Sequence, residues 1–229
     1  MSPYEHDNQT AELPEAAWLT ALLSLPKMGP RRLDALIDQE GSARSSWDHI
    51  RADSGLRLAN TSSDILAGWR EAAGHYDVVH RWVAMQQLGI RAATPTDANF
   101  PERLLLDPHR PRLIFQRGTL PSGPTVGIVG TRTCTAYGQR CAFELGRALV
   151  EAGISVVSGL ALGIDAAAHQ GALAGSPDES DSDGTVVGVV GSGLDVVYPK
   201  RNERLWETCL LYTSPSPRDR TRSRMPSSA

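Results

Sequence analysis

The sequence has few cysteines, and it has neither cysteines at metal-ligand spacing nor a long apolar run. Its three cysteines, Cys134, Cys141 and Cys209, are odd in number and have no metal-ligand spacing, so we expect packing residues in a reducing compartment and no metal. No apolar run approaches the roughly 18 residues that cross a bilayer, and the polar, acidic start does not resemble a signal peptide. These absences predict a cytoplasmic chain that does not enter a membrane.

Two motifs of nucleotide-dependent enzymes are also missing. The sequence has no Walker A pattern, and its nearest approach to G-x-G-x-x-G, at 191–196, lacks the third small residue. ATP hydrolysis and dinucleotide-dependent redox chemistry are therefore disfavoured, and no cofactor is predicted. The net charge of -3, with 21% charged and 41% hydrophobic residues, is typical of a globular chain of one or two domains.

Three Val/Ile-rich runs, each ending in a glycine loop, dominate the second half of the sequence. They occupy 125–130, 154–159 and 185–191, and their continuous apolar character is typical of parallel strands buried on both faces. Helical spacing fills the intervals from Tyr137 to Gly153 and from Asp165 to Gly175. The order β-α-β-α-β predicts an α/β fold with a Rossmann-like, doubly wound parallel sheet.

The glycine loops are expected to meet at one edge of this sheet. Right-handed crossovers make the strands parallel, and the first two loops precede helix N-termini, which favour anions. A loop arginine there is unfavourable without an anion, so Arg132 is the residue hardest to explain structurally. We therefore predict a phosphate-binding groove. Its candidate nucleic-acid-binding residues are Gly130, Thr131, Arg132, Ser158, Gly159, Lys200 and Arg201.

Several residues of these loops also have structural interpretations. Glycines after strands often serve positive φ angles or tight packing, which applies to Gly159 and more strongly to Gly163. Asp165 is favoured as a helix N-cap over an acid catalyst. His169 has no second ligand at metal spacing and is interpreted as a packed or hydrogen-bonded histidine.

The N-terminal part of the sequence has a helical pattern instead. Helices are predicted over 12–24, from Leu33 onward, around Trp47 and over 63–88, and the tryptophans are interpreted as core anchors rather than a base-stacking platform. The turn at 25–33 resembles a helix-hairpin-helix, whose amides can hold a phosphate. An αα-hairpin that packs and binds nothing is the favoured alternative.

Five segments, taken in order, carry a resemblance to a known family. Together they resemble the DNA-processing protein family DprA, also called Smf, over roughly 90–207, and the helical region resembles the SAM-like domain that often precedes it. The fourth segment is long and specific, unlike a lone glycine pattern. The segments are Pro101–Leu104, Arg112–Gly118, Ile128–Arg132, Ser158–His169 and Gly191–Pro199.

The resemblance implies a non-enzymatic protein that binds single-stranded DNA, protects incoming DNA in natural transformation and helps to load the RecA recombinase. It also implies a homodimer formed through the Rossmann-like domain. Arg132 matches the family's DNA-binding arginine, and Lys200 lies where a basic contact is expected. Two alternatives remain open: a nucleotide hydrolase resembling phosphoribohydrolases, whose P-G-G-x-G-T-x-x-E string is absent, and a protein-interaction module.

Three regions are expected along the chain. A SAM-like helical domain occupies 1–89, and a Rossmann-like DNA-binding domain occupies 90–208, in which the strand at 112–118 extends the sheet. The last region, 209–229, is interpreted as a disordered tail of vector origin, with a basic nucleic-acid arm as the alternative. The domain would then be truncated, with an incomplete sheet and a doubtful dimer. The acidic run at 178–183 is expected to be a solvated loop at the edge opposite the groove.

Overall fold

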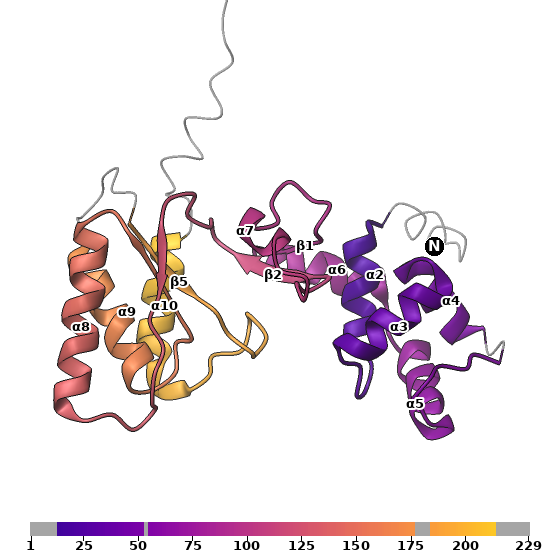
Figure 1. Cartoon of the computed structure of the whole chain (residues 1–229). Coiled ribbons are helices and arrows are strands. Elements are labelled where there is room, and N and C mark those ends of the chain that lie inside the picture. The colour runs from indigo at the N-terminus through magenta and orange to yellow at the C-terminus, as the bar shows by residue number, and fades with distance from the viewer. Residues whose placement is uncertain (1–12, 53–54, 177–183, 214–229) are drawn as a thin grey trace, which may run out of the picture. The chain divides into compact units, whose positions relative to one another are not determined.

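The computed structural model describes residues 13–52, 55–176 and 184–213 (Figure 1). The chain divides into two units, Met1–Phe115 and Gln116–Ala229, and each has its own hydrophobic core. Among the described residues, no helix is both long and apolar enough to cross a membrane. The division falls later than the boundary expected near residue 90, because the segment from 90 to 113 places Leu113 in the first core.

The first unit is built from helices around buried tryptophans. Trp18, Trp47 and Trp69 are almost fully buried, so their interpretation as core anchors is confirmed. The single helix predicted over 63–88 is wrong: the chain forms two helices there, because the Asp77 side chain caps a new helix by accepting from the His80 N–H at 2.9 Å. The helices are α2 (Glu15–Leu23), α3 (Pro30–Glu40), α4 (Ala43–Arg51), α5 (Ser63–Gly74) and α6 (Val78–Gln87).

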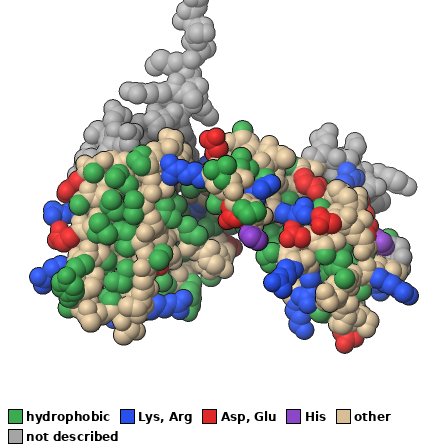
Figure 2. Space-filling model, in the orientation of Figure 1, with side chains coloured by type: hydrophobic (Ala, Val, Ile, Leu, Met, Phe, Trp, Pro, Cys, Tyr) green, Lys and Arg blue, Asp and Glu red, His purple; other side chains and the backbone are tan. Residues whose placement is uncertain are grey.

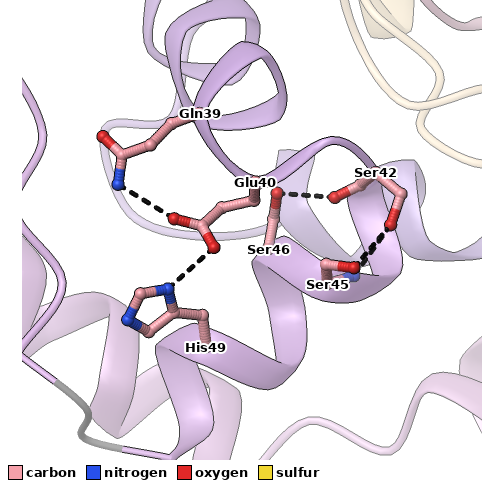
Figure 3. A network of polar contacts seen from close by, with 6 residues as sticks. All are labelled: Gln39, Glu40, Ser42, Ser45, Ser46 and His49. Carbon is pink, nitrogen blue, oxygen red and sulfur yellow. Dashed lines mark hydrogen bonds and ion pairs between the residues drawn. The ribbon is translucent and has the colours of Figure 1, made fainter.

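A polar network fixes the junction between α3 and α4 (Figure 3). Gly41 ends α3 in the left-handed conformation at φ 83°, and the Ser42 hydroxyl caps α4 by accepting from the Ser45 N–H at 3.0 Å. His49 Nδ1 lies 2.8 Å from a Glu40 carboxylate oxygen, and this hydrogen bond holds the pKa of Glu40 below its ordinary value. The two helices are thus joined by side chains as well as by the chain itself.

The turn between α2 and α3 is held from inside the first unit. The Trp69 indole N–H donates to the Pro26 carbonyl at 2.8 Å, and Arg32 Nη1 donates to the Lys27 carbonyl at 2.8 Å. Lys27 itself adopts a positive φ of 57°. These contacts are those of an αα-hairpin that packs against its own unit.

Two short strands form a small sheet of their own. β1 (Ile90–Ala93) pairs with β2 (Ile114–Arg117), and α7 (Glu102–Leu105) lies between them in sequence. The prediction that the segment 112–118 extends the main sheet is therefore wrong. The physical reason is that this segment packs on the first unit: β2 pairs with β1 and Leu113 is buried in the first core. The Arg112 guanidinium adds ion pairs to Asp34 and Asp38 of α3, the latter at 2.8 Å.

The second unit contains a parallel sheet in the order β3-β4-β5, with the predicted β-α-β-α-β sequence. This confirms an α/β, Rossmann-like fold. Val156 of the central strand is in register with Val126 and Val186 and has no exposed surface. The elements are β3 (Thr125–Gly127), α8 (Ala136–Glu151), β4 (Ser155–Ser158), α9 (Ile164–Gly175), β5 (Val186–Gly188), the 3-10 helix η1 (Lys200–Asn202) and α10 (Glu203–Thr213).

Helices α8 and α9 lie on the same side of this sheet (Figure 1). Both right-handed crossovers step in one direction along the strand order, so both helices must fall on one face. Two valines just beyond β3 and β5 remain exposed to solvent: Val129 is 78% exposed and Val189 is 62% exposed. The expectation of burial on both faces is therefore met by the central strand β4, whose burial includes Ser155 and Val156, and is not met by the edge strand β3.

Helix α10 continues beyond the point where the sequence predicted the ordered chain to end. Leu205, Trp206 and Cys209 are buried in the second core, and burial raises the pKa of the Cys209 thiol to about 12. The spacing of these residues continues a helical face through residue 209, which the expected tail boundary missed. The rest of that tail, 214–229, and the acidic run at 178–183 lie outside the described residues.

The contact between α8 and α9 depends on glycine. A Cβ atom at Gly171 would lie 1.9 Å from the Phe143 carbonyl oxygen, and one at Gly146 would lie 2.3 Å from the Ala168 carbonyl oxygen. These distances are far shorter than any tolerated contact, so the two helix backbones touch directly. The tight pairing sets where both helix N-termini lie at the sheet edge.

The substitution Gly171→Ala is expected to lower the free energy of unfolding by about 2 kcal/mol, because overpacking against backbone outweighs the gain in helix propensity. Urea unfolding followed by far-UV circular dichroism measures the change. Gly138→Ala on α8 is the matched control, since its Cβ would meet only ordinary contacts near 3.5 Å, and it should be neutral or stabilising. Equal destabilisation by both variants would contradict this account.

Candidate nucleic-acid interface

The loops after β3 and β4 are in direct backbone contact. The Ile164 N–H donates to the Thr131 carbonyl at 3.2 Å. A Cβ at Gly163 would lie 2.3 Å from that same oxygen, and Gly163 has a φ of 84°, which glycine adopts readily. The positive φ expected at Gly163 is confirmed. The two loops therefore form one surface at the carboxyl edge of the sheet.

A buried carboxylate links the same two loops. Asp165 is 7% exposed and accepts hydrogen bonds from the Gly130 N–H at 3.2 Å and from the Gly159 N–H at 3.1 Å. Its interpretation as an N-cap is wrong, because Gly163 is the N-cap and Asp165 is the second residue of α9. A negative charge in the first turn of a helix is favourable, so the position suits a carboxylate.

Gly130 and Gly159 serve this internal contact. Their N–H groups are donated to Asp165, and a Cβ at Gly159 would lie 2.6 Å from the Asp165 Oδ2 atom. A Cβ at Gly130 would lie 2.7 Å from the Ile164 Cγ1 atom. Both glycines are thus required for loop packing, and both N–H groups are already satisfied without a ligand.

Ser158 also has a structural role rather than the predicted ligand-binding one. It is 2% exposed, and its hydroxyl donates to the Ile128 carbonyl at 2.5 Å across neighbouring strands. A hydroxyl that is buried and already donating cannot contact a ligand at the surface. The nearby Thr131 is exposed, but its hydroxyl forms a turn with the Thr133 N–H at 3.2 Å.

Asn202 brings the third predicted segment to the same edge. Its side-chain amide donates to the Leu160 and Ala161 carbonyls, at 2.9 and 3.1 Å, and so ties η1 to the loop after β4. Lys200 and Arg201, the first two residues of η1, are thereby placed against that loop. Asn202 was not among the site residues predicted from the sequence. The only signal was an asparagine directly after two cations, which does not identify its acceptors.

Three cations at this edge are free of internal partners. Arg132, Lys200 and Arg201 are exposed and make no hydrogen bond or ion pair through their side chains with any residue that the structure describes. Arg147, in contrast, pairs with Glu144 and Glu151 near the other end of α8. Figure 2 shows Lys and Arg side chains along the lower edge of the left-hand body, where the loops emerge in Figure 1.

His169 is packed below this edge, as the sequence predicted. It has no exposed surface, and its Nε2 atom lies 3.2 Å from the Val187 carbonyl oxygen. A carbonyl can only accept, so Nε2 carries the proton. Burial lowers the pKa of His169, opposed by this hydrogen bond, and the side chain is neutral at pH 7. Within the described ranges, no three His, Cys, Asp or Glu side chains gather as metal ligands.

Comparison with known proteins identifies the family. The family model described as DNA recombination-mediator protein A matches residues 91–213, which is more than half of the chain. The chain belongs to this family. All the site residues predicted from the sequence, from Gly130 to Arg201, lie inside the matched region. The family resemblance drawn from the sequence motifs is thus confirmed.

Individual relatives agree with this assignment. Protein Smf of Synechocystis sp. is 38% identical over 128 residues, covering 53% of this chain and 30% of the relative. DNA processing protein DprA of Streptococcus pneumoniae is 41% identical over 97 residues, covering 42% of this chain and 32% of the relative. The chain thus spans about a third of the length of these curated relatives.

A solved structure shares the fold. The X-ray structure of DNA processing protein A from Streptococcus pneumoniae superimposes with a TM-score of 0.60 at 27% sequence identity. The likeness covers 85% of this chain and 64% of the solved chain. The fold of this chain is therefore similar to that of a solved DNA processing protein A.

Replacing Asp165 with asparagine is expected to lower the free energy of unfolding by about 2 kcal/mol, because hydrogen bonds to a charged acceptor contribute about 1.5–3 kcal/mol. The asparagine amide would also present its own donors to one of the two loop N–H groups. Urea unfolding and faster hydrogen exchange at Gly130 and Gly159 measure the effect. Asp195→Asn, at an exposed loop position, is the control and should change stability by less than about 0.5 kcal/mol.

The buried imidazole predicts a pH dependence of stability. His169 has a folded-state pKa below its ordinary value of 6.5, so the unfolded chain binds more protons in the window between the two values. The stabilisation is complete above pH 6.5 and is lost as the pH falls toward the folded-state pKa. We expect the free energy of unfolding to fall between pH 7 and pH 5, at about 1.4 kcal/mol for each unit by which the pKa is lowered.

The variant His169→Gln should flatten this profile, because glutamine can still donate to the Val187 carbonyl but does not titrate. Urea unfolding at several pH values measures the slope. His109→Gln, at a side chain 93% exposed, should leave the slope unchanged. An unaltered slope in His169→Gln would show that other groups dominate.

Proposed function

We propose that this chain binds the phosphate backbone of single-stranded DNA at the carboxyl edge of the β3-β4-β5 sheet. The observation that carries the proposal is a set of three exposed cations, Arg132, Lys200 and Arg201, which have no side-chain partner among the described residues and lie on segments that internal hydrogen bonds hold together. Exposed charge without a partner on fixed backbone is suited to a polyanion, since little ordering is needed on binding.

The residues of the site divide by role. Arg132, Lys200 and Arg201 would contact phosphates, whereas Gly130, Ser158 and Gly159 hold the loops in place. Thr131 has an intermediate role, because it is exposed but its hydroxyl already accepts a hydrogen bond within a turn. Binding through phosphates predicts strong salt dependence and little readout of base sequence.

The negative net charge is compatible with this proposal. Local clusters of cations create a positive field whatever the total charge of the chain, so the −3 balance does not oppose binding at the edge. The proposal also needs no catalytic step. The buried titratable groups below the edge, Asp165 and His169, are engaged in hydrogen bonds within the fold.

Family membership extends the proposal to DNA processing. Relatives of this chain are named DNA processing proteins. We accordingly propose that the parent protein protects incoming single-stranded DNA in natural transformation, helps to load the RecA recombinase and dimerises through the Rossmann-like unit. These parts of the proposal are supported by membership of the family alone, whereas DNA binding is supported also by the geometry of the edge.

Binding of a labelled single-stranded oligonucleotide across a salt series tests the site. Arg132→Ala and Lys200→Ala are each expected to weaken binding about ten-fold and to reduce the slope of log affinity against log salt by about 0.7, the value for one phosphate contact on a single strand. Fluorescence anisotropy gives both quantities. The double variant should lose more than either single variant.

The control for these variants is Arg147→Ala. It removes the same charge from the same unit, but its guanidinium is paired with Glu144 and Glu151 near the end of α8 remote from the loops. It should leave the affinity and the salt slope almost unchanged. A loss equal to that of Arg132→Ala would show that only the total charge matters and would contradict a site at the edge.

A further inference from the structure

The aromatic side chains of the second unit fall into two groups. Trp206 is 5% exposed and Phe143 is partly buried, as is usual for aromatic residues. Tyr137 and Tyr198, in contrast, are 78% and 64% exposed. They are the only strongly exposed aromatic rings among the second-unit side chains that the structure describes. Both belong to the segments that carry the unpaired cations.

Tyr137 is held beside the Arg132 loop. It is the second residue of α8, which begins directly after that loop. The Thr135 hydroxyl caps the helix by accepting from the Gly138 N–H at 3.1 Å, so the backbone around Tyr137 is fixed. Its ring is therefore presented to solvent from a rigid first turn rather than from a free loop.

Tyr198 occupies the matching place beside Lys200. It comes two residues before Lys200, in the segment that leads into η1, and Asn202 ties η1 to the loop after β4. The preceding turn is closed by the Val196 N–H, which donates to the Gly193 carbonyl at 2.9 Å. Each exposed ring thus has an exposed cation close by in sequence, and both pairs lie at the carboxyl edge.

We propose that Tyr137 and Tyr198 stack on bases of the single strand whose phosphates contact Arg132 and Lys200. This inference rests on the proposed function and adds the surface that distinguishes single strands from duplexes. Bases of a single strand are free to stack on a protein ring, whereas those of a duplex are already stacked and paired. Stacking tolerates any base, in keeping with binding that reads little sequence.

The test compares an oligothymidine with an abasic oligonucleotide of equal length, which has the same phosphates and no bases. The wild-type chain should bind the oligothymidine more tightly. Tyr137→Ala and Tyr198→Ala should each weaken oligothymidine binding on the order of ten-fold, while binding to the abasic strand and the salt slope stay unchanged. Tyr137→Phe and Tyr198→Phe should retain wild-type affinity, because they keep the ring.

Leu145→Ala is the control, since Leu145 is a half-exposed apolar residue farther along α8 and should not contact the strand. Equal wild-type affinity for both oligonucleotides would overturn the stacking proposal while leaving phosphate binding in place. Full affinity of the two alanine variants for oligothymidine would do the same. Failure of the wild-type chain to bind either oligonucleotide would instead refute the proposed function, and stacking with it.

Discussion

The carboxyl edge of the second unit depends on one buried carboxylate. A buried charge is tolerated only when hydrogen bonds replace its water, and Asp165 obtains two from the backbone of separate loops. Asn202 then attaches η1 to the second of these loops through two further hydrogen bonds. The loop from 159 to 163 therefore makes contacts with both of the other segments at this edge. These contacts fix the backbone that carries the exposed cations.

At this edge, the residues that hold the loops differ from the residues that are available to bind a ligand. The small residues hold the loops in place: the Gly130 N–H donates to Asp165, and the Ser158 hydroxyl is buried and donates to the Ile128 carbonyl. Long charged residues such as Arg132 extend outward without internal partners among the described residues. This arrangement lowers the conformational entropy lost on binding, because the backbone is ordered before a ligand arrives and only side chains need to be fixed.

The sequence predicted the parts of this unit that local pattern controls. Apolar runs and helical spacing located strands β3, β4 and β5 and helices α8 and α9, though not α10, and the order of elements was enough to bring the glycine loops to one edge. Local sequence pattern did not predict the structure where a contact between residues distant in sequence determines it. The packing of Leu113 in the first core accompanies the pairing of β2 with β1 instead of the main sheet, and the Asp165 contact with Gly130 spans 35 residues. Neither contact has a signature in the residues flanking it.

The close approach of Gly163 to Thr131 has a consequence for variation among related chains. Surface loops ordinarily tolerate insertions. Here an added residue in either loop would displace the Thr131 carbonyl from the Ile164 N–H or Gly130 from Asp165, and the contacts on both loops would be lost together. Substitutions of the side chains that face solvent are therefore compatible with both loops. Changes in the length of either loop are not, because each loop's length is fixed by its contacts with the other.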